Sequence, residues 1–204
     1  MLIDNTSLNV VLIGDWNKLY IQPNWIAENV YCQKEIELGV IGQGTEFSIT
    51  YRCENIVISP SQNQMIFAAL DMNNLTIERL SLIINNFLQK ATTPVLTAYG
   101  LNCEFSEINS SQFAEVVDTI SDSSNIIESG FEILSTKISR SLSKDGVILN
   151  LESSQIENKT VMHFNEHHGI SKNEMPVIDA NMINSFITTT KNLIIAFGYD
   201  IEEE

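Results

Sequence analysis

The sequence predicts an α+β fold, in which antiparallel β-meanders form a sheet and two long amphipathic helices pack on one face of it. Residues 35–41 and 47–51 alternate apolar and polar side chains, as half-buried strands do. Residues 76–91 and 180–197 instead carry apolar side chains at helical spacing. Because a sheet and an amphipathic helix each need a partner for their apolar side, two packed layers are expected.

The first half of the chain reads as a series of short strands. A run of β-branched and aliphatic residues at 10–13 precedes Gly14-Asp15 and predicts an opening strand and turn. Residues 24–33 are ambiguous between a short helical and an irregular segment. Further strands are expected at 19–21, 35–41, 47–51, 56–58 and 65–70.

A helix over 76–91 follows this meander. Asn74 or Thr76 is the expected N-cap, and Pro94 prevents the helix from continuing. The apolar run after Pro94 predicts a strand over 95–105, with Gly100 as a candidate break.

The second half repeats this plan. Lys144-Asp145-Gly146 predicts a type I′ hairpin between strands at 131–142 and 147–151. A third strand is expected at 160–166. Asp179 is the expected N-cap of the helix over 180–197, and Gly198 is its left-handed stop.

Two domain descriptions fit this pattern. The chain forms either a single α+β domain over 1–204, or two lobes, 1–108 and 131–204, joined by the Ser- and Asn-rich segment 109–130. That segment contains one short amphipathic helix near Phe113.

An internal duplication of β-meander–α halves would explain the repeated plan, although generic amphipathicity explains it more simply.

Composition limits the classes of partner. The net charge is −15, with only 11 Lys and Arg, so the basic surface that binds nucleic acid or an anionic membrane is missing. Acidity serves either solubility or attraction to a basic partner, and mimicry of DNA is one form of the latter.

Cys32, Cys53 and Cys103 are odd in number and far apart, as is typical of reduced thiols in a cytoplasmic protein. Neither a secretory leader nor a membrane span is expected.

The three histidines lie within six positions, and His163, Glu166 and His167 match the H-x-x-E-H zinc-hydrolase signature. That signature needs a helix, whereas the surrounding β-branched and apolar residues predict a strand. In a strand, His163 and His167 would lie roughly 13 Å apart, too far to share one ion. The favoured interpretation is polar histidines at a strand end. Metal ligation by His163, Glu166 and His167 is the alternative.

No catalytic set and no cofactor-binding loop is evident. Predicted strands surround the glycines at 39, 42 and 44 and no helix follows them, which favours a hairpin over a phosphate loop. Trp16, Tyr20 and Trp25 are candidate anchors for a partner, with core packing as the alternative.

The leading hypothesis is a non-enzymatic protein–protein interaction or assembly subunit of a bacterial or phage complex, as a homodimer or with a protein partner. Strands 35–41 and 137–143 alternate in polarity, so one face of the sheet is expected to be polar and open to such contacts. An acidic inhibitor or DNA mimic, and a metal-dependent hydrolase using the histidine cluster, are the alternatives.

Overall fold

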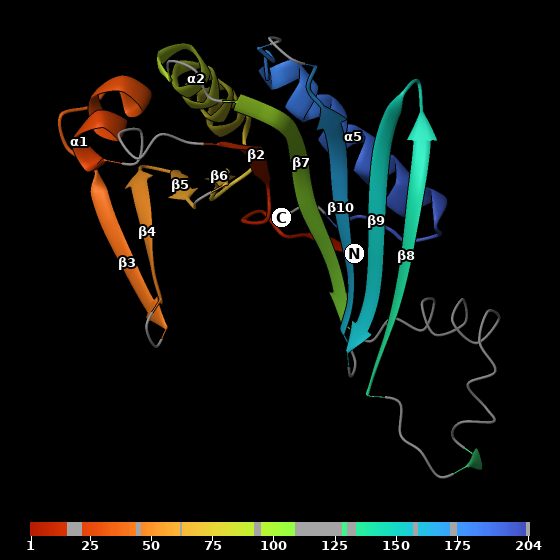
Figure 1. The fold of residues 1–204 in the computed structure, drawn as a ribbon. Helices are drawn as coiled ribbons and strands as arrows, with labels where there is room; N and C mark the ends of the chain where they lie inside the picture. The colour runs from red at the N-terminus through yellow and green to blue at the C-terminus, as the bar shows by residue number, and fades with distance from the viewer. Residues whose placement is uncertain are drawn as a thin grey trace.

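The computed structural model describes residues 1–15, 22–43, 46–61, 63–91, 95–108, 128–129, 134–156, 159–171 and 175–202. Within these residues the fold is α+β with a mostly antiparallel sheet, which confirms the predicted class (Figure 1). The strands are β1 (Leu2–Ile3), β2 (Asn9–Asp15), β3 (Glu37–Gln43), β4 (Glu46–Cys53), β5 (Ile56–Pro60), β6 (Gln64–Ala69), β7 (Val95–Ile108), β8 (Ser135–Lys144), β9 (Val147–Ile156) and β10 (Lys159–Gly169). The helices are α1 (Pro23–Ile26), which continues into the π-helical turn η2 (Ala27–Tyr31), α2 (Asn74–Lys90) and α5 (Ala180–Ala196).

One sheet contains all ten described strands. From edge to edge the order is β3-β4-β5-β6-β2-β7-β10-β9-β8, and β1 pairs with β7 beyond the end of β2. β7 therefore lies near the middle, between β2 from the first half of the chain and β10 from the second half. β3 and β8 are the two outer strands.

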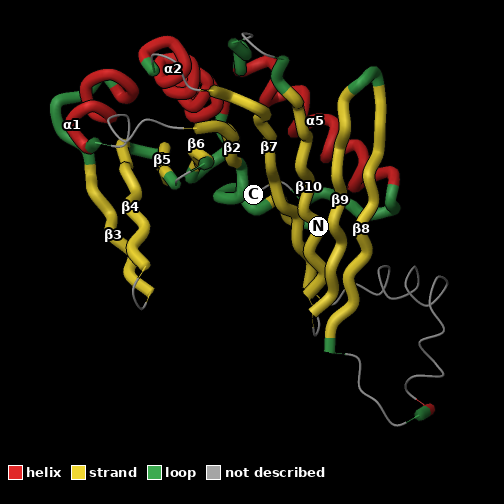
Figure 2. Tube along the Cα trace, viewed as in Figure 1, coloured by secondary structure: helices red, strands yellow, loops and turns green. Residues whose placement is uncertain are grey.

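Helices α2 and α5 lie on the same side of the sheet and contact each other (Figure 2). Ser81 Oγ and Asn85 Nδ2 of α2 each donate a hydrogen bond to the carbonyl of Ile178, just before α5 begins. A single apolar cluster lies between the helices and the sheet, and both halves contribute to it, with Phe67, Phe87, Phe105, Phe164 and Phe186 among its fully buried side chains.

Several local predictions are confirmed. Asp145 and Gly146 have φ values of 53° and 82°, as a type I′ turn requires, and they join β8 to β9. Asp179 caps α5 by accepting a hydrogen bond from the backbone N–H of Met182 at 2.7 Å. Gly198 has a φ of 90° just after the helix.

Other local predictions were wrong. The N-cap of α2 is Asn73, whose Oδ1 accepts from the backbone N–H of Thr76, and not Asn74 or Thr76. β7 runs unbroken through Gly100, and β10 continues to Gly169 because it stays paired with β7 along that length. For segment 24–33, expected to be either short helical or irregular, the helical alternative is confirmed, because most of it forms α1 and η2.

Two expected elements, the strand at 19–21 and the short helix within 109–130, lie outside the described residues apart from positions 128–129. Among the helices that the structure describes, none is long and apolar enough to cross a membrane.

Candidate interaction surface

The two faces of the sheet are chemically different. Side chains alternate along β7, and Cys103 faces the helices, where its Sγ lies 3.5 Å from Oγ1 of Thr190 on α5. Its neighbour Asn102 therefore faces away from α2 and α5. We call this second side the open face. It consists of Asn9, Asn102, Asn165, Asn150 and Ser141 and the side chains two positions away from each on β2, β7, β10, β9 and β8.

A hydrogen-bonded ladder of asparagine side chains crosses the open face. These residues are direct partners in the sheet register, so their side chains stand in one row. Each amide bonds to the next: Asn102 Nδ2 donates to Asn9 Oδ1 (2.9 Å), Asn165 Nδ2 to Asn102 Oδ1 (2.8 Å), Asn150 Nδ2 to Asn165 Oδ1 (3.3 Å), and Ser141 Oγ to Asn150 Oδ1 (2.8 Å). The ladder thus connects five adjacent strands.

The ladder fixes the orientation of its amides. An asparagine side chain carries two N–H donors and an oxygen with two lone pairs, and at Asn102 the ladder uses one donor and one lone pair. Asn102 is only 7% exposed, whereas Ser141, at one end of the row, is exposed. The row therefore runs from a buried amide at Asn102 to an exposed hydroxyl at Ser141, and its hydrogen bonds set the positions of these groups before any partner binds.

Gly100 leaves room for this arrangement. A Cβ at position 100 would lie 2.8 Å from Nδ2 of Asn165 and 3.4 Å from the carbonyl oxygen of Glu166. The first distance is shorter than a non-bonded contact allows, so any larger residue would displace the asparagine. Gly100, which the sequence suggested as a strand break, instead gives the ladder space within an intact strand.

Charged groups flank one side of the ladder. In the register, His163 of β10 lies opposite Glu104 of β7 and Glu152 of β9. Glu152 also forms an ion pair with Lys137 of β8, with 2.7 Å between Oε2 and Nζ. The open face therefore combines an uncharged amide row with nearby charged groups of both signs.

The structure separates the three candidate metal ligands. His163 and His167 are on the open face, while strand alternation places Glu166 on the helix side. There Glu166 Oε1 lies 2.8 Å from Nε2 of His168, whose ring stacks on Tyr99 with centroids 4.5 Å apart. Across the described part of the chain, no three His, Cys, Asp or Glu side chains are grouped so as to hold a metal ion.

Of the three candidate anchor aromatics, Trp16 and Tyr20 lie outside the described residues. Trp25 is half-buried and packs edge-on against Phe87, with ring centroids 6.1 Å apart and an interplanar angle of 89°. Trp25 thus helps to fix α1 against α2.

Sequence reasoning missed the asparagine ladder. One signal was present, because asparagine is depleted in strands, yet three of the four ladder asparagines stand inside predicted strands and Asn9 directly precedes another. The pairing of these asparagines could not be inferred from the sequence, since Asn102 is 93 positions from Asn9 and 63 from Asn165.

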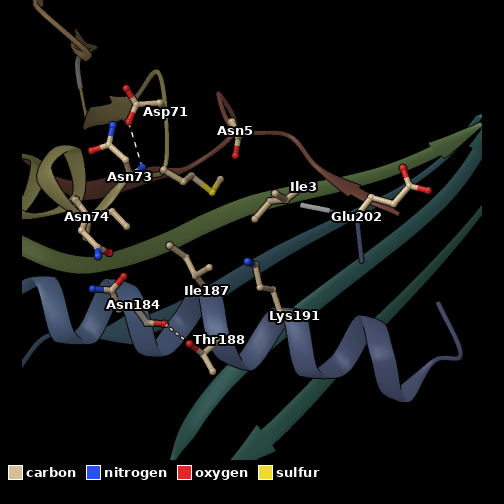
Figure 3. Close-up of a pocket in the computed structure, with 12 residues that line it drawn as sticks. Ile3, Asn5, Asp71, Asn73, Asn74, Asn184, Ile187, Thr188, Lys191 and Glu202 are labelled. Atoms are coloured by element: carbon tan, nitrogen blue, oxygen red, sulfur yellow. Dashed lines mark hydrogen bonds between the residues drawn. The ribbon is translucent and has the colours of Figure 1, made fainter. Parts of the chain in front are cut away.

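A polar cleft of about 520 Å³ lies on the helix side, where the start of α2, the middle of α5 and the segments near both chain ends meet (Figure 3). Asn74, Asn184 and Thr188 line it together with Asp71, Lys191 and other residues. Its charged groups have both signs. Asp71 is already engaged, because its Oδ1 accepts from the backbone N–H of Asn73 at 3.1 Å.

No protein-family model matches this chain, and no curated protein matches its sequence. The open face, with its ordered ladder, is the most distinctive surface among the residues described.

Proposed function

We propose that this chain is a non-enzymatic interaction or assembly subunit that binds a protein partner through the open face. The asparagine ladder is the observation that carries this proposal. Ordering a flexible side chain at an interface costs about 0.5–1.5 kcal/mol, and a side chain that is already held by its neighbours avoids much of that cost. A row of pre-positioned amides is therefore a favourable binding surface for polar groups.

The open face is of suitable size for a protein partner. Neighbouring strands lie about 4.8 Å apart, so five strands span roughly 19 Å, and ten residues of strand extend about 33 Å. The corresponding flat area of roughly 630 Å² is similar to the ~800 Å² that each partner contributes to a standard interface. Side-chain relief adds to the flat value.

The chemistry of the face indicates the kind of partner. The amide row is uncharged, and its neighbours Glu104, His163 and Glu152 offer hydrogen-bonding and charged groups. A polar protein surface with its own donors and acceptors suits this pattern better than an apolar one. The net charge of −15 argues against direct contact with nucleic acid.

We further infer that the two halves derive from a common β-meander–α unit. In each half a meander of antiparallel strands precedes a helix, namely β3 to β6 before α2 and β8 to β10 before α5. We also propose that the chain binds its partner within a cytoplasmic bacterial or phage complex.

The test is affinity capture of a partner from native lysate with matched variants. Ser141→Arg places a bulky cation at the exposed end of the ladder, whereas Leu82→Arg does so on the outer side of α2, where Leu82 is 60% exposed. We expect Ser141→Arg to weaken partner binding at least about tenfold, which corresponds to about 1.4 kcal/mol, and Leu82→Arg to leave it unchanged. Equal binding by both variants, or capture of no partner by the wild-type chain, would contradict the proposal.

A further inference from the structure

The two outer strands of the sheet are protected to different degrees. β8 carries Lys137, Arg140 and Lys144 and no acidic residue. Charged side chains, lysine above all, are a common means of preventing an outer strand from pairing with another chain. β3 contains neither Lys nor Arg, and its only charged residue is Glu37. Among the described strands, basic side chains therefore guard the β8 edge but not the β3 edge.

The β3 edge also exposes apolar side chains. Leu38 and Val40 are 54% and 60% exposed, and Ile49 of β4, which lies opposite Val40, is 40% exposed. All three face the helix side, because Leu38 is paired with the buried Tyr51. Figure 1 shows β3 and β4 extending beyond α1, away from the helical layer. We call Leu38, Val40 and Ile49 the edge patch.

We propose that the edge patch is a homodimer interface, in which β3 of one copy pairs antiparallel with β3 of a second copy about a twofold axis at Gly39. In this register Leu38 of each copy lies opposite Val40 of the other, so that two apolar cross-strand pairs form on one face. Glu37 lies opposite position 41, which is an isoleucine, so no like charges face each other. Pairing would also give each β3 strand backbone hydrogen-bond partners along its outer edge.

Other pairings of the two edges fit less well. Two β8 strands would bring Lys137, Arg140 and Lys144 of each copy together, and like charges across a strand pair are destabilising. A β3 strand paired with a β8 strand would leave a free β3 edge at one end of the assembly and a free β8 edge at the other, so further copies could add without limit. The β3–β3 contact closes after two copies, as the commonest oligomers do.

This dimer is independent of the proposed partner binding. Pairing at β3 extends the sheet sideways and leaves the open face of each copy accessible. Loss of the dimer and loss of the partner are therefore separate results, which variants at different sites distinguish.

Sedimentation equilibrium of the purified chain over a hundred-fold range of concentration tests the proposal. Val40→Lys adds a cation to the edge patch, and Leu82→Lys is the matched control, because Leu82 has the same 60% exposure on α2. We expect a reversible dimer for the wild-type chain and for Leu82→Lys. For Val40→Lys we expect a dimer dissociation constant raised about 100-fold. Circular dichroism confirms that each variant is folded.

A charge-swap experiment keeps the result specific to this contact. Val40→Lys and Val40→Glu should each be mainly monomeric alone, while an equimolar mixture should form dimers. In the proposed register, residue 40 of one copy lies diagonally across from residue 40 of the second copy, so like charges repel and opposite charges attract. A wild-type chain that stays monomeric, a polymer that grows with concentration, or dimers of unchanged affinity in Val40→Lys would each overturn the proposal.

Discussion

Asn165 of β10 donates a hydrogen bond from Nδ2 to Oδ1 of Asn102 on β7 over 2.8 Å, although the two residues are 63 positions apart. This bond lies in the centre of the ladder and joins the strand contributed by the second half of the chain to the central strand of the first. A one-residue slip of β10 would move Asn165 to the apolar helix side. The ladder therefore stabilises the register between the halves as well as forming the proposed interface.

Asn102→Ala should destabilise the fold, because it removes two ladder bonds at a residue that is only 7% exposed. We expect a loss of about 1–3 kcal/mol in the free energy of unfolding. Urea denaturation measures it. Ser143→Ala on the exposed outer strand is the control and should stay within about 0.5 kcal/mol of wild type. Equal effects of the two substitutions would show that the ladder does not contribute to stability.

Gly100→Ala should also destabilise the fold, by about 1–3 kcal/mol, because the added Cβ overlaps Nδ2 of Asn165. The cost should fall when Asn165→Ala is present, since the overlapping amide is then gone. A double-mutant cycle by urea denaturation measures this coupling. Additive effects of the two substitutions would mean that Gly100 is needed for a reason other than the ladder.

His168 and His167 are adjacent in sequence and differ in environment. His168 stacks on Tyr99 and bonds to Glu166, whereas His167 is exposed on the open face. His168→Ala should therefore lower the free energy of unfolding by about 1–3 kcal/mol, and His167→Ala should change it by less than about 0.5 kcal/mol. Thermal and urea unfolding of both variants provide the comparison. The reverse order would contradict the assigned faces of β10.

Stability should decrease under alkaline conditions. Burial raises the pKa of the Cys103 thiol from its ordinary value of 9.0 to about 12, so the folded state keeps a proton that the unfolded state releases. The free energy of unfolding contributed by this thiol is therefore fully present below pH 9.0 and is lost as the pH rises toward about 12. Burial also raises the pKa of Tyr31, Tyr51 and Tyr99, which adds to the loss.

Urea unfolding over a series of alkaline pH values checks this prediction. In Cys103→Ala the slope of unfolding free energy against pH should be smaller, by at most about 1.4 kcal/mol per pH unit. Cys32→Ala is the control, because Cys32 is exposed. Identical slopes in wild type and Cys103→Ala would show that the thiol is not protected by burial.

The chain should not hold stoichiometric zinc at the histidine cluster. His163 and His167 are four strand positions apart, or roughly 13 Å, and Glu166 is on the other face. Metal analysis of protein purified without chelators should find well under one zinc per chain. One zinc per chain that disappears in His163→Ala would restore the metal hypothesis.

Local signals predicted the elements whose structure is set by neighbouring residues. The cap at Asp179 and the turn at Asp145-Gly146 each depend on a few consecutive side chains or φ values, and both are found as expected. The strand nature of residues 160–166 followed from their β-branched and apolar content, and it already argued against the helical zinc motif. Neighbouring candidate caps were harder to separate, as Asn73 in place of Asn74 shows.

The candidate site depended on contacts that local patterns do not encode. The ladder needs β2, β7, β10 and β9 in one specific register, and its residues come from distant parts of the chain. Gly100 was ambiguous for the same reason, because its role is defined by Asn165 on another strand. Likewise, the unprotected edge at β3 became evident only when the strand order was known.

Site-specific photo-crosslinking in native lysate shows whether the open face contacts the partner. A photoreactive phenylalanine analogue at His167 lies on the open face, and the same analogue at Leu82 lies on the outer side of α2. If the open face binds the partner, the analogue at position 167 should form a crosslink to one protein of defined mass, and the analogue at position 82 should not. A crosslink from position 82 alone, or none from position 167, would contradict the proposed function.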